Sequence, residues 1–300
     1  MLVARTEHGK SDLSHGDLGT MRQPFRLAIV ATVVTGFAFQ ASAALAADEI
    51  FPDENLRNVI SKIMHKKTGK EEIDESKLKD IYFLKAPGKK IANLTGLEKC
   101  RNLAQINLAD NAIEDVSPLA GLMNVQSLDL SKNKIGDLTP LGKLAKLQYL
   151  QLEGNQIEKL DALKELKKLS ALYLSKNKVQ SVAPLSGLEK LTSLYLDDNQ
   201  LTDVKGLEKL KWLSSLDLRN NKIEDVTPLA SMTELRYTML QKNKVTDIAP
   251  LVAMAKKDAE GDRRFAPYWH LYLKDNPLND EATKSHIPEL KNHGVRVKME

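Results

Sequence analysis

The chain has 300 residues, of which 42% are hydrophobic and 28% are charged, a composition typical of a soluble globular protein. Its 44 basic and 40 acidic residues leave a net charge of +4, so overall charge gives no argument for nucleic-acid binding. The single cysteine, Cys100, excludes an intramolecular disulfide framework and a cysteine-rich metal site, so we expect a continuous apolar core to hold the fold.

The start of the chain predicts a secretory signal peptide over residues 1–47. A short basic segment at 21–26 precedes an apolar run at 27–39, and small residues at 41–43 and 44–46 fit a peptidase site. Met21 is a candidate true start, because the residues before it are polar and irregular. The alternative is an uncleaved membrane anchor, since 27–47 is just long enough to span a bilayer, but the alanine-rich end favours cleavage. We therefore expect a protein that is secreted or periplasmic, without stable membrane insertion after cleavage.

Residues 48–90 predict an N-terminal cap. Apolar side chains over 53–66 recur at helical spacing, which indicates a helix that packs on the first repeat. Residues 73–84 predict a second short helix and a strand. The apolar positions of the first helix are Leu56, Val59, Ile60, Ile63 and Met64.

A period of 22 residues organises the central part of the chain and predicts a solenoid. The repeating frame is L-x-x-L-x-L-x-x-N-x-I-x-D-V-x-P-L-x-x-L, in which two alternating leucines indicate a short strand. Each asparagine amide carries donors and acceptors, so we expect it to satisfy backbone groups of neighbouring turns. The last step is 33 residues, which predicts an insertion at about 255–269. The ladder asparagines are Asn111, Asn133, Asn155, Asn177, Asn199, Asn221, Asn243 and Asn276.

The return side of each turn is too short for a long helix, so we expect 3₁₀ or single-turn helices there. Ser117, Thr139 and Thr227 each precede a proline, and their hydroxyls are predicted to cap these helices.

These motifs resemble the leucine-rich repeat over about residues 91–278. Together with "FPDENLRNVI" and "NLTGLEKCRNLAQINLADNAIEDVSPL", they resemble the internalin-type group of bacterial secreted leucine-rich repeat proteins. The resemblance implies an α/β solenoid: a right-handed curved rod with a parallel concave β-sheet, a short 3₁₀ or helical convex side and a helical N-terminal cap. Residues 279–300 then form a C-terminal cap. No immunoglobulin-like domain or wall anchor is recognised, which departs from adhesive internalins and argues against host adhesion.

No residue pattern indicates catalysis. The histidines do not stand at metal-ligand spacing, and no nucleophile or phosphate-binding motif is present. Cys100 occupies a leucine position of the repeat, which predicts a buried, inert thiol. An aspartate column, one residue per turn, is better explained by turn capping than by calcium, which needs converging oxygens. We expect no enzyme activity, no cofactor and no metal site.

The outward strand positions predict a binding face. Aromatic residues and arginine are typical interface anchors, although tyrosine also suits exposed strand positions. We predict a non-catalytic extracytoplasmic binding protein, a monomer that recognises a protein ligand through its concave face and binds no nucleic acid. The alternatives are a structural cell-envelope component, contacts through the convex face or termini, and, if the chain is not exported, a phosphatase-regulating repeat protein. The predicted binding residues are Tyr149, Tyr173, Tyr195, Asp217, Arg219, Tyr237, Met239, His270 and Tyr272.

Overall fold

The computed structural model describes residues 50–68 and 73–299, with the side chains of 66–68 excepted. The predicted signal peptide, residues 1–47 with its candidate start at Met21, lies outside the described residues. Within these ranges, no helix combines the length and the apolar character needed to cross a membrane.

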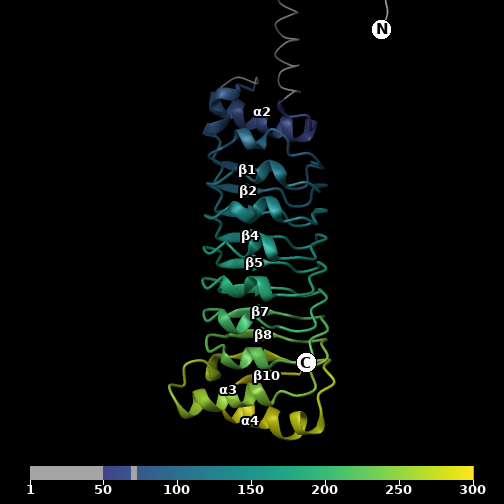
Figure 1. Ribbon diagram of the computed structural model, residues 1–300, viewed down its shortest axis with the longest axis vertical. Coiled ribbons are helices and arrows are strands. Elements are labelled where there is room, and N and C mark those ends of the chain that lie inside the picture. The colour runs from purple at the N-terminus through teal and green to yellow at the C-terminus, as the bar shows by residue number, and fades with distance from the viewer. Residues whose placement is uncertain (1–49, 69–72, 300) are drawn as a thin grey trace, which may run out of the picture. The chain divides into compact units, whose positions relative to one another are not determined.

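The described part of the chain contains one parallel sheet of ten strands, each three residues long (Figure 1). The strands pair in the order of the sequence, so each turn of the chain lays one strand beside the previous one. The strands are β1 (Phe83–Lys85), β2 (Gln105–Asn107), β3 (Ser127–Asp129), β4 (Tyr149–Gln151), β5 (Ala171–Tyr173), β6 (Ser193–Tyr195), β7 (Ser215–Asp217), β8 (Tyr237–Met239), β9 (His270–Tyr272) and β10 (Arg296–Lys298).

Each strand buries its middle residue and turns its first and third residues to the other side of the sheet, because consecutive strand side chains alternate. Leu128, Leu150 and Leu172, for example, are all fully buried. They belong to a single apolar core that runs from Phe51 to Val297. No single turn could bury its own leucines, so the free energy of burial comes from stacking one turn on the next.

Strand β8 departs from this pattern, because Thr238 holds the position that leucine holds in β3 to β7. Thr238 is fully buried, and its hydroxyl accepts a 2.9 Å hydrogen bond from the indole nitrogen of Trp269. Trp269 is also fully buried, at the residue before β9. The threonine therefore satisfies an indole N–H that a leucine would leave unpaired.

The asparagines form a hydrogen-bonded ladder along the stack. The side-chain nitrogen of Asn177 donates to the carbonyl of Leu152 in the preceding turn (2.9 Å) and to that of Leu174 in its own turn (3.0 Å). Its side-chain oxygen accepts from the backbone nitrogen of Ile157 at 3.0 Å. Each interior asparagine thus joins two turns through groups that are out of reach of water. The same pattern recurs at Asn133, Asn155, Asn199, Asn221 and Asn243, which are 6–8% exposed, and at the more exposed Asn111 and Asn276.

Short 3₁₀ helices form the return segments between strands. They are η2 (Leu97–Lys99), η3 (Ser117–Leu119), η4 (Thr139–Lys143), η5 (Asp161–Leu163), η6 (Ala183–Gly187), η7 (Leu207–Lys209) and η8 (Thr227–Ser231).

The predicted hydroxyl caps of these helices are wrong. Ser117 and Thr139 lie inside η3 and η4, and no side chain caps either helix from the residue before it. An aspartate two residues earlier takes this role: Asp115 and Asp137 each accept the backbone N–H of the hydroxyl residue at 2.8 Å. A carboxylate is the stronger acceptor, so it forms the turn that starts the helix. The predicted turn-capping role of the aspartate column is confirmed.

At the N-terminal end, α2 (Glu54–Thr68) and η1 (Glu75–Asp80) precede β1. The buried stripe of α2, Leu56, Ile60 and Met64, packs into the core of the stack, and Val59 and Ile63 are partly buried against the same core.

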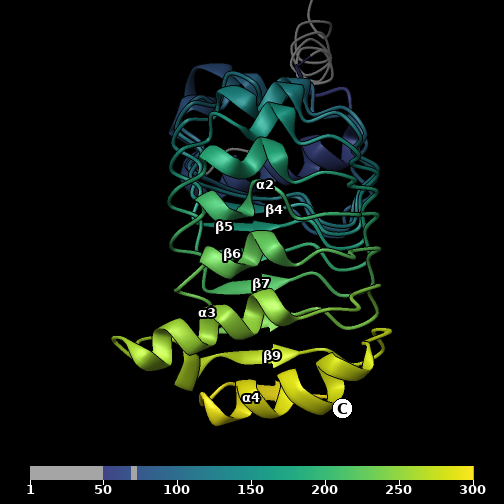
Figure 2. The same ribbon diagram turned by 60° about the horizontal axis from the view of Figure 1, so that its bottom comes forward.

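At the C-terminal end, the longer step of the repeat forms α3 (Ala249–Glu260) and η9 (Ala266–Tyr268) between β8 and β9. The helix thus begins before the segment predicted as the insertion and continues into it. A π-helical turn, η10 (Ala282–His286), leads into α4 (Ile287–Asn292), which contacts both α3 and β10 (Figure 2).

Candidate functional site

Two rows of side chains run along the solvent-facing side of the sheet, one from the first residue of each strand and one from the third. The strand register places Tyr173 beside Tyr195, and Tyr237 beside His270. Neighbouring strands lie about 4.8 Å apart, so ring side chains in one row are held at stacking distance.

Three tyrosines, Tyr149, Tyr173 and Tyr195, form what we call the tyrosine cluster. The rings of Tyr173 and Tyr195 stack with centroids 4.9 Å apart and an interplanar angle of 16°. Tyr149 lies in the other row, and its ring tilts toward Tyr173 at 5.3 Å. The neighbour of Tyr149 in its own row is the small Ala171, which leaves room for this diagonal contact. The cluster is therefore a preformed aromatic surface.

The hydroxyls of Tyr149 and Tyr173 stay protonated at neutral pH. Burial raises the pKa of Tyr149, and Tyr173 and Asp129 raise it further. Burial also raises the pKa of Tyr173, with Tyr195 adding to the effect. These two hydroxyls can thus donate a hydrogen bond to a partner as well as accept one.

A second group, which we call the His270 cluster, consists of Tyr237, Met239, His270 and Tyr272. Tyr237 stacks on His270 with ring centroids 5.0 Å apart, and Tyr237 is 45% exposed. A guanidinium nitrogen of Arg296 lies 3.0 Å from Nε2 of His270. Arginine only donates, so this imidazole nitrogen accepts and the ring is neutral. Partial burial, Arg296 and Lys298 all lower the pKa of His270, which agrees with that assignment.

Sequence reasoning missed Arg296 and Lys298. Strand β10 pairs with β9 so that Arg296 continues the row of His270 and Lys298 continues the row of Tyr272. The step from His270 to Arg296 is 26 residues rather than the 22 of the repeat, so the repeat frame does not predict where these residues lie. The available signal was the alternation Arg296-Val297-Lys298, which marks a strand with one inward side chain.

The pair Asp217 and Arg219 lies between the two clusters, and the structure corrects the prediction for Asp217. Its side chain is only 1% exposed, because Arg219 covers it. The guanidinium contacts both carboxylate oxygens, with Nε at 2.9 and 3.0 Å and Nη2 at 2.6 Å. Asp217 is thus unavailable to a partner and instead orients Arg219, which is 47% exposed.

A hollow of about 460 Å³ opens beside Arg219. Its lining includes Lys242 and Lys274 as well as Asp197. The side-chain oxygen of Gln241, which also lines it, is buried and has no hydrogen-bond partner among the described residues. A donor from a bound molecule would satisfy this oxygen.

Other chemistry is sparse. In residues 50–68 and 73–299, no group of three or more histidine, cysteine or acidic side chains is arranged to hold a metal ion. Burial, together with Glu98, raises the pKa of Cys100 to about 12, so the thiol is protonated and unreactive, as predicted.

A family model described as "Leucine Rich repeats (2 copies)" matches residues 124–165, 167–209 and 189–231. A solved internalin (inlF) from Listeria monocytogenes is 27% identical, with a TM-score of 0.62 over 84% of this chain and 76% of that one. The protein is an internalin-like leucine-rich repeat protein. Internalin C2 from the same organism is 25% identical, with a TM-score of 0.58 over 85% of this chain and 96% of that one.

The internalin-like chain also shares its fold with a more distant protein. The leucine-rich repeat ectodomain of the receptor kinase GASSHO1/SCHENGEN3 from Arabidopsis thaliana, solved in complex with CASPARIAN STRIP INTEGRITY FACTOR 2, has a TM-score of 0.56 and 19% identity. That match covers 69% of this chain and 26% of the plant chain, and it supports the fold alone. No curated protein matches the sequence significantly. The parallel sheet, the short helices and the internalin similarity confirm the predicted leucine-rich repeat solenoid.

Proposed function

We propose that this internalin-like protein is a non-catalytic binding protein that recognises a protein ligand through the solvent-facing side of its sheet. The tyrosine cluster is the observation that carries the proposal. Stacked rings lose little conformational entropy on binding, and they offer apolar faces together with hydroxyl donors. Arg219, held in place by Asp217, and the His270 cluster supply charged and aromatic contacts on the same face.

We further propose that residues 1–47 export the chain and that the protein acts as a monomer outside the cytoplasm. In this proposal the repeats of 91–278 present the binding face between caps at 48–90 and 279–300. Edman or mass-spectrometric sequencing of the mature N-terminus tests the export step, because cleavage after residue 43 or 46 is expected.

The binding face is tested by affinity capture from the extracytoplasmic fraction. Wild-type protein and the Met123→Ala variant, altered at a 47% exposed methionine outside the two rows, should retain the same partner. The Tyr173→Ala/Tyr195→Ala double variant should lose it while keeping its circular dichroism spectrum. Equal capture by all three proteins would move the site to the other side or to the caps. If the tyrosine variants had no effect on capture and deletion of the gene disturbed the cell envelope, the structural role would be favoured instead.

A further inference from the structure

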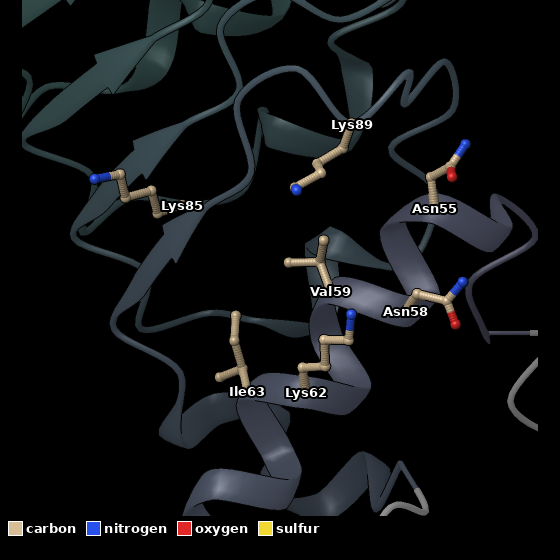
Figure 3. A pocket seen from close by; sticks show the side chains of 7 residues that line it. All are labelled: Asn55, Asn58, Val59, Lys62, Ile63, Lys85 and Lys89. Atoms are coloured by element: carbon tan, nitrogen blue, oxygen red, sulfur yellow. The ribbon is translucent and has the colours of Figure 1, made fainter.

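A hollow of about 380 Å³ lies at the N-terminal end of the described chain, between α2 and the segment that follows β1 (Figure 3). It is outside the tyrosine and His270 clusters, and the proposed function does not use it. Val59 and Ile63 of α2 line its apolar part, and Lys62, Lys85 and Lys89 line its rim.

The charges around this hollow have one sign. Figure 3 shows Lys62 and Lys89 extending toward each other across Val59, whereas the side chain of Lys85 points away from Val59. No acidic side chain is among the residues that line the hollow. Two ammonium groups that converge without a carboxylate repel each other, and a bound anion would remove that repulsion.

The α2 wall of the hollow is held in place by Asp53. One carboxylate oxygen of Asp53 accepts the backbone N–H of Leu56 at 3.0 Å, at the start of α2. The other accepts the backbone N–H groups of Ala92 and Asn93, at 2.8 and 3.0 Å. This one side chain therefore ties the helix to the first repeat.

The opposite wall is held by the first ladder asparagine. The side-chain oxygen of Asn111 accepts the backbone N–H of Lys89 at 3.0 Å and that of Ile91 at 2.9 Å. The side chain of Asn55 in α2 reaches across to the carbonyl of Lys90. The backbones that carry Lys62 and Lys89 are thus fixed relative to each other before any ligand binds, which lowers the entropic cost of binding.

We propose that this hollow binds a small amphiphilic anion, namely the carboxylate of a single-chain fatty acid. The carboxylate lies between the ammonium groups of Lys62 and Lys89, and the start of the alkyl chain covers Val59 and Ile63. The volume is near the lower end of the range for small-molecule sites, which suits one chain rather than a two-chain lipid.

The test is a methyl NMR titration of the full mature protein with octanoate. The Val59 and Ile63 methyl signals should shift and saturate, and acetate at the same concentration should leave them unmoved because it cannot cover the apolar floor. Octanol should bind more weakly than octanoate because it lacks the charge. Higher ionic strength should weaken octanoate binding.

Lysine variants show which ammonium groups bind the octanoate carboxylate. Lys62→Gln and Lys89→Gln should each weaken octanoate binding by about threefold, and the double variant by about tenfold. Lys85→Gln is the matched control, since this lysine lines the same hollow but points away, and its affinity should change by less than about twofold. An unchanged amide spectrum shows that each variant is folded.

Three results would overturn the proposal: no saturable shift of the two methyl signals, equal affinity of wild type and double variant, or acetate binding as tightly as octanoate. Vesicles that bind while free octanoate does not would also overturn it, in favour of a membrane headgroup. None of these results bears on the sheet face, so this proposal fails or stands separately from the proposed function.

Discussion

Arg219 covers the carboxylate of Asp217 and contacts both of its oxygens, leaving Asp217 1% exposed. Replacing Arg219 by methionine keeps much of the covering side chain but leaves a nearly buried carboxylate without its cation. We expect Arg219→Met to lower the free energy of unfolding by about 2 kcal/mol, below the usual cost for a fully buried pair because Arg219 is half exposed. Urea denaturation measures the change.

The matched control for this pair is the double variant Asp217→Asn/Arg219→Met. It removes the charge along with its partner, so it should recover most of the lost stability in a double-mutant cycle. If Arg219→Met were as stable as the wild type, the carboxylate would have reached water by another route.

The ladder asparagines should contribute to stability according to their burial. Asn177→Ala leaves the N–H of Ile157 and the carbonyls of Leu152 and Leu174 without their side-chain partner, so we expect a loss of about 2–4 kcal/mol. Asn111 bonds in the same way near the end of the stack, where it is more exposed, and Asn111→Ala should cost about half as much. Comparable losses at the two positions would show that burial does not control the effect. Thermal and urea unfolding provide the measurement.

At Thr238, the leucine of the repeat consensus should be less stable than the threonine that is present. Thr238→Leu restores the leucine of β3 to β7 but leaves the buried indole N–H of Trp269 unpaired, so we expect a loss of about 1–3 kcal/mol. Thr238→Ser keeps the hydroxyl and should lose only the contribution of a methyl group, about 1 kcal/mol. A Leu variant more stable than wild type would contradict the role assigned to the hydrogen bond.

The capping aspartates predict a loss of stability in acid. The hydrogen bonds from the hydroxyl and then from the N–H of Thr139 lower the pKa of Asp137. Burial works against the charged form of Asp53, but backbone N–H groups, that of Ala92 first, leave its pKa lowered overall. A carboxylate whose pKa is lower in the folded protein stabilises the folded state while it is charged. When it becomes protonated, that stabilisation is lost. The stabilisation is therefore fully present above the unfolded value, near 3.8, and is lost as the pH falls through the folded value.

The Asp53→Asn variant tests this pH dependence. It should be less stable than wild type at neutral pH, and the difference should shrink as the pH drops below about 4. The stability of both proteins is measured from denaturant midpoints between neutral pH and acid. A stability difference that stays constant with pH would contradict the lowered pKa of Asp53.

The stacked tyrosines predict separate effects on binding and on folding. Tyr195→Phe keeps the stack on Tyr173 and should retain the partner with a modest loss of affinity, whereas Tyr195→Ala should weaken binding by about 2 kcal/mol. The folded state should lose only about 1 kcal/mol in the alanine variant, because the ring is half-buried. Surface plasmon resonance with the captured partner, alongside thermal unfolding, separates the two effects. Equal affinity of the alanine variant and the wild type would remove Tyr195 from the site.

Much of this molecule follows from its sequence, because a constant period and local alternation are properties of neighbouring residues. The 22-residue step sets one strand per turn, and the alternation around Leu150 and Leu172 determines which side chains point inward. Once the strands are aligned, Tyr173 and Tyr195 must be neighbours in one row, so their stacking could be expected from the sequence.

Other features were decided only by the tertiary structure, because they join residues whose spacing departs from the period. The step from His270 to Arg296 is 26 residues rather than 22, which hides their alignment. The hydrogen bond from Trp269 to Thr238 crosses the 33-residue step between β8 and β9. The burial of Asp217 depends on the rotamer that Arg219 adopts above it, which the order of residues does not specify. The hollow between Lys62 and Lys89 exists because Asp53 docks a helix from outside the repeats onto the first turn, and no repeat frame encodes that contact.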